Sequence, residues 1–348
     1  MRILIFTDPH WSSFSSIVRN RGTVYTARLE NLIKSINWVE QLALFEHCDA
    51  IFCLGDFFDK NEQTAEELTA LKEIKWSGIS HCWLVGNHEI SRGSLEFSTA
   101  HLFSLCQNST IIDNPCNFDL PNEDTEICFL PYISSLKDKS NIKDYFEDIG
   151  KFSRRIVFSH NDLKGIQYGA FVSKEGFELS DIENYCDLFI NGHLHNGEKI
   201  TSKIVNLGNL TGQNFGEDAN KYSHCVAILD TETLHMDYYE NPFAFNFYKY
   251  TATNLDDFTK FISTIKNNAV LTVKANEEIY ADVKTIISKC ESVVDSRVLL
   301  DIERKGVSDT IEISELAKID HIQSFKDYIL NNLGNSQIIQ EELQEISE

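Results

Sequence analysis

The sequence predicts a layered α/β domain followed by a smaller α+β domain. Two observations lead to this prediction. In the first part of the chain, apolar runs of strand type alternate with segments of helical periodicity, which is typical of layered α/β domains. After residue 198 the pattern changes to β-hairpins, and a β-α-β unit follows. The length of 348 residues suits two domains of this kind.

The first part contains six apolar runs that we interpret as strands, at 2–7, 50–54, 81–85, 127–130, 155–159 and 187–190. Between them, 25–46 and 64–76 have helical periodicity. The N-terminal run is short and continues directly into polar residues, so we interpret it as a core strand. It is neither a signal peptide nor a membrane span, and we expect no membrane association.

The second part begins with two predicted hairpins, 198–210 and 223–240, the latter turning at 230–233. Asn254 is a candidate N-cap for a helix, and a strand (269–275), a helix (278–290) and a strand (293–303) follow. Residues 323–348 read as two amphipathic helices broken at Gly334. The predicted organisation is therefore a catalytic domain (1–245), a small β-α-β domain (246–320) and C-terminal helices (321–348).

Composition limits the function in two ways. The formal net charge of −22 argues against a strongly basic nucleic-acid-binding surface, although an enzyme could still reach a phosphodiester through bound cations. The nine cysteines include no CxxC pair, and several lie in apolar runs. We therefore expect reduced, buried thiols in a cytoplasmic protein and no zinc–cysteine cluster.

Side chains that offer oxygen or nitrogen donor atoms follow five of the six predicted strands. Because ligand sites in open α/β sheets form at the carboxyl ends of strands, we expect these side chains to converge. Any one of them alone would be read as a turn or cap residue, but together they include five of the eleven histidines. The set comprises Asp8, His10, Asp56, Asn87, His88, His160, His193 and His195.

Carboxylate, imidazole and amide oxygen without thiolate suit divalent ions such as Mn²⁺, Fe²⁺ or Zn²⁺. With His88 left aside, seven donors are too many for one closed site. They fit two adjacent metals that share a carboxylate, an arrangement that clamps the attacking and leaving oxygens in phosphoryl transfer. The sequence thus predicts a two-metal phosphoesterase centre.

The order of these motifs, DxH…GDxxD…GNH[DE]…H…GHxH, resembles that of the calcineurin-like metallophosphoesterases across residues 8–195. The resemblance implies a sandwich of two β-sheets flanked by helices. It implies two metals, expected to be Mn²⁺, that share Asp56. The first would be held by Asp8, His10, Asp56 and His195. The second would be held by Asp56, Asn87, His160 and His193.

In the mechanism that the resemblance implies, a metal-bridged hydroxide attacks phosphorus in line, and no covalent enzyme intermediate forms. His88 would be catalytic, stabilising the phosphate or protonating the leaving oxygen. Asp59 would orient a ligand.

Three features narrow the substrate. Lys60 and Asn61 follow Asp59, whereas protein Ser/Thr phosphatases carry an arginine there, so the sequence disfavours a protein phosphatase. The stretch 205–217 resembles one in SbcD-type nuclease subunits of double-strand-break repair complexes, with Asn209 and Leu210 replacing Ser-Pro. The small α+β domain that follows the catalytic one resembles the DNA-capping domain of those nucleases. The resemblance implies a DNA exonuclease or endonuclease for repair and recombination, with an SMC-like coiled-coil ATPase of SbcC type as partner. It also implies a homodimer built from helices near 64–76 and 93–107.

Other interpretations stay open. A phosphodiesterase or phosphatase acting on a small nucleotide would share the same centre, and a non-catalytic scaffold would share the fold. The acidic end of the chain is either a solvated helix face or a docking element. Candidate DNA contacts lie in the insert 11–28, which could also be an ordinary surface loop, and just after the third motif. They are Arg19, Arg21, Arg28 and Arg92.

Overall fold

The computed structural model describes residues 1–301 except 15–21, 135–140, 147–151 and 169–170. Residues Met1–Asp301 form one compact unit. The predicted C-terminal helices (321–348) and the candidate DNA contacts Arg19 and Arg21 lie outside the described residues.

The first sheet has six strands in the order β16-β15-β1-β2-β3-β6. Strands β1, β2, β3 and β6 are parallel, while β15 and β16 form an antiparallel hairpin beside β1, as predicted for 223–240. Their bounds are β1 Arg2–Phe6, β2 Ala50–Cys53, β3 Ser80–Leu84, β6 Ser109–Ile112, β15 Cys225–Asp230 and β16 His235–Glu240.

The second sheet has the order β13-β14-β12-β9-β8-β7. Its four central strands are parallel, and the edge strands β13 and β7 are antiparallel to their neighbours. The bounds are β7 Cys116–Leu120, β8 Thr125–Leu130, β9 Arg154–Ser159, β12 Leu188–Asn191, β13 Glu198–Lys199 and β14 Ile204–Asn206.

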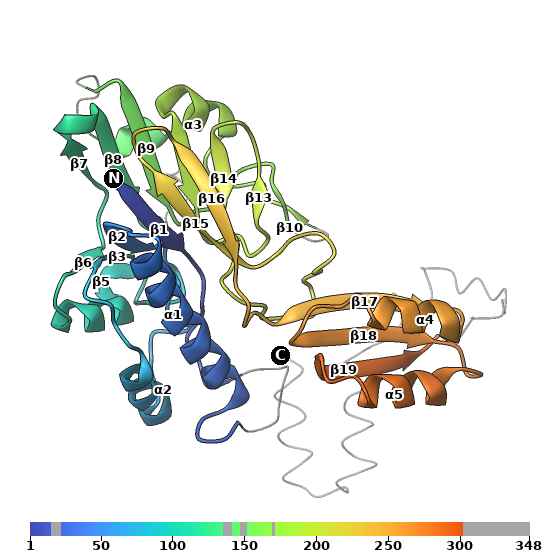
Figure 1. The fold of residues 1–348 in the computed structure, drawn as a ribbon. Coiled ribbons are helices and arrows are strands. Elements are labelled where there is room, and N and C mark those ends of the chain that lie inside the picture. The colour runs from blue at the N-terminus through green and yellow to red at the C-terminus, as the bar shows by residue number, and fades with distance from the viewer. Residues whose placement is uncertain (15–21, 135–140, 147–151, 169–170, 302–348) are drawn as a thin grey trace, which may run out of the picture. The chain divides into compact units, whose positions relative to one another are not determined.

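The two sheets pack face to face. One apolar cluster joins Ile5 and Phe52 of the first sheet to Phe129, Phe158 and Ile190 of the second. Helix α1 (Ala27–Phe45) packs on the outer face of the first sheet and α3 (Leu179–Tyr185) on that of the second (Figure 1). This sandwich of two sheets flanked by helices confirms the predicted fold class. It forms because alternating side chains along each strand are buried, on one face against the other sheet and on the other face against a helix.

The helices begin at side-chain caps that the sequence supplies. Thr26 caps α1, and Thr64 with Glu67 forms a capping box at α2 (Ala65–Ala70). The predicted helix 64–76 is thus α2 continued by the 3₁₀ turn η1 (Leu71–Glu73). The remaining short elements are η3 Pro121–Glu123, η4 Ile142–Tyr145, β10 Gln167–Tyr168 and β11 Phe171–Val172.

The predicted helix near 93–107 is wrong. Strand β5 (Ser94–Ser98) pairs with β4 (Ile90–Ser91), and the 3₁₀ helix η2 (Thr99–Leu105) follows. Ser98 accepts a hydrogen bond from the amide of Ala100, so it ends the strand and starts the 3₁₀ segment. The apolar spacing that suggested one helix is therefore divided between two elements.

The third sheet is small and wholly parallel, in the order β17-β18-β19. Its strands are β17 Asn246–Ala252, β18 Ala269–Ala275 and β19 Val293–Leu300, and α4 Leu255–Ile262 and α5 Tyr280–Ser288 connect them. Phe258 of α4 and Val283 of α5 lie in one cluster with Leu271 and Val273, so both helices cover the same face. Sequence reasoning missed β17, because its aromatic residues obscured the alternation.

No helix in the described part of the chain is both long enough and apolar enough to span a bilayer.

Candidate metal centre

The predicted donors follow β1, β2 and β3 of the first sheet and β9 and β12 of the second. The loops that carry them meet where the carboxyl ends of these strands lie together. Four donors have left-handed backbone conformations, which are rare for residues other than glycine, with φ of 51° for Asp8, 50° for His10, 49° for Asp56 and 70° for His193. Such strained residues concentrate at functional sites, where the surrounding fold holds them in place.

The first group of donors is Asp8, His10 and His195, whose ligand atoms lie within 4.8 Å of one another. The Nε2 atoms of His10 and His195 face each other at 3.2 Å. Nδ1 of His10 lies 3.2 Å from a carboxylate oxygen of Asp59, which fixes the proton on Nδ1. In the neutral ring, the lone pair on Nε2 of His10 therefore points into the site, and Asp59 has the orienting position expected for it.

The second group is Asp56, His160 and His193, also within 4.8 Å. Nδ1 of His160 donates to the Leu54 carbonyl at 2.6 Å, so Nε2 carries the lone pair of the neutral ring. That Nε2 faces Oδ2 of Asp56 at 3.1 Å and Oδ1 of Asn87 at 3.3 Å. Three electron-pair donors thus converge on one point, which is the arrangement that a cation requires.

The residues present fit two metal ions. Oδ1 of Asp8 is buried and has no hydrogen-bond partner among the described residues, although a buried carboxylate oxygen normally has one. Asp56 lies in one possible metal-ligand group with His10 and His88 and in another with His160 and His193, as a bridging ligand would. Carboxylate, imidazole and amide donors are the expected set for Mn²⁺, Fe²⁺ or Zn²⁺. The structure thus brings all seven predicted ligands together.

The electrostatics of the cluster favour added positive charge. Burial opposes an imidazolium at His10, yet the hydrogen bond with Asp59 and the nearby carboxylates of Asp8 and Asp56 raise its pKa to about 10. Burial likewise opposes the Asp8 carboxylate, but the histidines His160 and His10 lower its pKa to about 2. At Asp56 the same balance holds the pKa well below its ordinary value. Buried carboxylates with this preference are suited to divalent cations, which would take the place of the protons on the rings.

His88 lies at the solvent side of the cluster, with its side chain 43% exposed. Its backbone amide donates to Oδ1 of Asp56 at 2.8 Å, and its Nδ1 donates to the Asp59 carbonyl at 2.9 Å. The ring stands edge-on to His10 with centroids 4.6 Å apart. His88 also shares a possible metal-ligand group with His10 and Asp56, so its assignment to catalysis instead of metal binding stays a prediction.

Sequence reasoning did not assign roles to two acidic residues that hold the centre together. Glu89 is fully buried and accepts hydrogen bonds from the amides of Phe58 at 3.0 Å and Gly86 at 3.1 Å, which ties the second and third motif loops together. Asp162 lies 3.0 Å from Nε2 of His193 and orients that ring. The position of Asp162, two residues after His160, was the only available signal.

The expectation that Arg28 faces DNA is wrong. Its side chain is buried, and its guanidinium donates to the carbonyls of Pro9 at 2.8 Å and Gly212 at 3.0 Å. Arg28 is the second residue of α1, so the fold directs it under the first motif loop instead of toward solvent. Arg92 is exposed and lies over the ring of Phe97 at 5.8 Å, and its predicted role stays a prediction.

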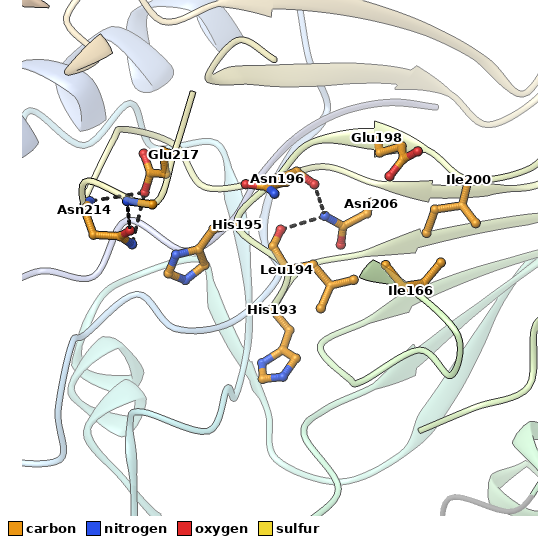
Figure 2. A pocket seen from close by; sticks show the side chains of 11 residues that line it. Ile166, His193, Leu194, His195, Asn196, Glu198, Ile200, Asn206, Asn214 and Glu217 are labelled. Atoms are coloured by element: carbon orange, nitrogen blue, oxygen red, sulfur yellow. Dashed lines mark hydrogen bonds between the residues drawn. The ribbon is translucent and has the colours of Figure 1, made fainter. Parts of the chain in front are cut away.

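A cavity of about 350 Å³ adjoins the centre (Figure 2). His193 and His195 form part of its wall. Its other lining residues are Ile166, Leu194, Asn196, Glu198, Ile200, Asn206, Asn214, Gly216 and Glu217.

Comparison with solved structures finds remote likenesses. A dimetal phosphatase from Danio rerio is 14% identical, with 69% of this chain and 96% of that chain covered at a TM-score of 0.41. The protein TT1561 of Thermus thermophilus is 8% identical, with 69% and 98% covered at a TM-score of 0.37. The calcineurin-like phosphoesterase YfkN from Bacillus subtilis is 11% identical, with 69% and 88% covered at 0.32.

No curated protein matches the sequence. The model of the calcineurin-like phosphoesterase family matches residues 1–197, which is more than half of the chain and includes all the strand ends described above. The chain therefore belongs to the calcineurin-like phosphoesterase family.

Proposed function

We propose that the protein is a metal-dependent DNA nuclease, the SbcD-like subunit of a DNA repair and recombination complex. The convergence of seven metal-type donors around Asp56 carries the phosphoesterase part of this proposal. Two divalent ions held there, Mn²⁺ in our proposal, would supply an activated water and offset charge on the phosphate oxygens.

The protein's own residues then perform three tasks. Asp59, Asp162 and the Leu54 carbonyl hold the rings of His10, His193 and His160 in the tautomers that leave lone pairs facing inward. Glu89 keeps the loops of Asp56 and Asn87 in register. His88, exposed at the rim, donates a hydrogen bond to the phosphate or gives a proton to the leaving oxygen.

A basic row on the third sheet supports a polyanionic substrate. In the register of the sheet, Thr272 of β18 lies opposite Lys249 of β17 on one side and Arg297 of β19 on the other. Lys274 is two residues further along β18 and is therefore on the same face. All three cations are exposed, and α4 and α5 cover the opposite face. In a chain of net charge −22, three cations on one sheet face form a candidate contact for a DNA backbone.

One loop connects this row to the metal centre. The guanidinium of Arg297 lies 3.9 Å from the ring centre of Phe215, and Lys249 donates to the carbonyl of Gly216. Gln213, in the same loop, donates to the backbone carbonyl of Asp8 at 2.9 Å. This loop belongs to the stretch 205–217 whose sequence resembles the SbcD-type nucleases, so the contacts support the same interpretation.

The proposed partners follow from the resemblance. For a homodimer, the exposed side chains of Leu68, Phe97, Leu102 and Leu105 line one hollow and offer an apolar surface. For the SMC-like ATPase, the docking segment would be the C-terminal helices.

A cytoplasmic location agrees with nine free cysteines.

The test is nuclease activity on end-labelled linear duplex and single-stranded DNA with Mn²⁺, alone and with the ATPase partner. We expect wild-type protein to degrade DNA and His88→Ala to lose at least about a hundredfold in rate, since a general acid contributes about that factor. His235→Ala is the matched control, because His235 is exposed on β16 and lies outside the donor groups.

The alternative is a phosphodiesterase or phosphatase of small nucleotides, which the volume of the adjoining cavity favours. Robust turnover of a small phosphodiester, with no DNA degradation even in the presence of the ATPase, would replace the nuclease proposal with this one. Absence of metal-dependent hydrolysis on every phosphoester would contradict both.

A further inference from the structure

The cavity beside the metal centre has a composition that differs from that of the centre itself. Ile166, Leu194 and Ile200 form an apolar wall of the cavity. They belong to the apolar cluster between the second sheet and α3. Figure 2 shows these side chains on one side of His193 and Asn214 and Glu217 on the other side of His195. A molecule that reaches the metals can therefore extend directly onto an apolar surface.

Among the described residues, no lysine or arginine lines this cavity, whereas two glutamates do. A second phosphate in the cavity would therefore find no lysine or arginine among these lining residues to pair with. It would also be repelled by the carboxylate of Glu198, which is exposed. The cavity therefore suits an uncharged part of the substrate, one with an apolar face and hydrogen-bonding edges.

Some of the polar lining groups are already committed to the fold. The amide of Asn206 donates to the carbonyls of Leu194 at 2.6 Å and Asn196 at 2.7 Å. Glu217 is buried and accepts from Asn209 and from the amide of Gln213. Asn196 and Glu198, which reach solvent, are the lining side chains placed to meet a ligand edge.

We infer that this cavity is a nucleoside subsite, which holds the base of one nucleotide next to the phosphodiester bound at the centre. The base would lie against Ile200, Ile166 and Leu194, with Asn196 and Glu198 at its edge. A volume of about 350 Å³ accommodates one nucleoside and excludes a base pair. The inference rests on the proposed function and adds that the base next to the scissile bond must leave its stack.

The test compares two substrates with the same leaving group, thymidine 5′-p-nitrophenyl phosphate and methyl p-nitrophenyl phosphate. Only the first carries a nucleoside. For Ile200→Ala and Asn196→Ala with Mn²⁺, we expect kcat/KM to fall about tenfold on the thymidine ester and less than about twofold on the methyl ester. Ile286→Ala, a half-buried isoleucine of α5 outside the cavity, is the matched control and should change neither.

A binding measurement separates this inference from the proposed function. Saturation-transfer NMR with thymidine on metal-free protein should detect binding to wild type and to Ile286→Ala, and weaker binding to Ile200→Ala. If wild type hydrolyses neither ester but binds thymidine through Ile200, the proposed function fails and the subsite stands. If the variants lose both esters equally, or thymidine binding does not respond to Ile200→Ala, the subsite is refuted while the phosphoesterase activity remains.

Discussion

At the scale of single residues, each histidine of the centre has one ring nitrogen that faces away from the metal site. The group that contacts this nitrogen decides whether the other nitrogen can bind a metal. Asp59 holds Nδ1 of His10, the Leu54 carbonyl holds Nδ1 of His160, and Asp162 holds Nε2 of His193. Each partner fixes one proton and thereby directs the other nitrogen inward. The centre is consequently arranged for metal before a metal arrives.

Removing the partner of His193 should weaken metal binding without unfolding the protein. We expect Asp162→Ala to lower Mn²⁺ affinity roughly 10- to 100-fold, because the ring of His193 loses its fixed orientation. Isothermal titration calorimetry measures this. Asp237→Ala is a matched control, since Asp237 makes a comparable 3.1 Å contact with His235 at the surface, away from the donors. Equal affinities in Asp162→Ala and Asp237→Ala would contradict the role of Asp162.

Arg28 links two loops from beneath. Arg28→Ala would leave the carbonyls of Pro9 and Gly212 without their donor, and it would remove the positive charge facing Glu217. We expect the free energy of unfolding to fall by about 3 kcal/mol, the scale of losing two hydrogen bonds to a charged group. Urea denaturation measures it, with Arg92→Ala as control, because Arg92 is exposed. A loss no greater than that of Arg92→Ala would show that Arg28 is not a structural link.

At the scale of elements, the third sheet presents cations on one face and helices on the other. We expect the double variant Lys249→Ala/Arg297→Ala to bind DNA several-fold more weakly. The slope of log K against log salt concentration should fall by the amount that corresponds to about two phosphate contacts. Fluorescence anisotropy at several salt concentrations measures both quantities. Lys284→Ala on α5, on the covered side of the same sheet, is the control. An unchanged salt dependence in the double variant would exclude this face as the DNA contact.

The same scale shows what a sequence can predict. The strands that carry the donors were found because continuous apolar runs end abruptly in Asp, Asn or His, a local signal. Strands β6, β7 and β17 were missed because their residues are half exposed or aromatic, and only their neighbours in the sheet make them strands. The burial of Arg28 is likewise decided by packing of α1 against loops distant in sequence. The convergence of the candidate donors was therefore predictable, whereas the residues that position them, Glu89 and Asp162, were not.

At the scale of the whole molecule, buried acids make stability depend on pH. Burial raises the pKa of Glu217 to about 7, despite hydrogen bonds from Gln213 and Asn209 and the charge of Arg28. The folded state therefore binds this proton more tightly than the unfolded chain does. Its stabilising contribution is present below the unfolded pKa of 4.5 and is lost as pH rises to about 7. Glu89, whose pKa burial also raises to about 7, acts in the same direction, and His224, whose pKa is lowered, acts in the opposite direction.

Glu217→Gln isolates that contribution. Between pH 5 and pH 8, we expect metal-free wild type to lose on the order of 3 kcal/mol of stability relative to this variant, the equivalent of its pKa shift. Urea denaturation at a series of pH values gives the two slopes. Glu232→Gln, in the exposed turn between β15 and β16, should follow wild type. Parallel slopes for wild type and Glu217→Gln would refute this account of Glu217.

The central claim is that one chain holds two metal ions that share Asp56, and counting bound Mn²⁺ tests it most directly. Electron paramagnetic resonance of free Mn²⁺ during a titration gives the number bound per chain. We predict two ions for wild type and for Asp237→Ala, and at most one for Asp56→Ala. A single ion or none in wild type, or two ions retained by Asp56→Ala, would contradict the account.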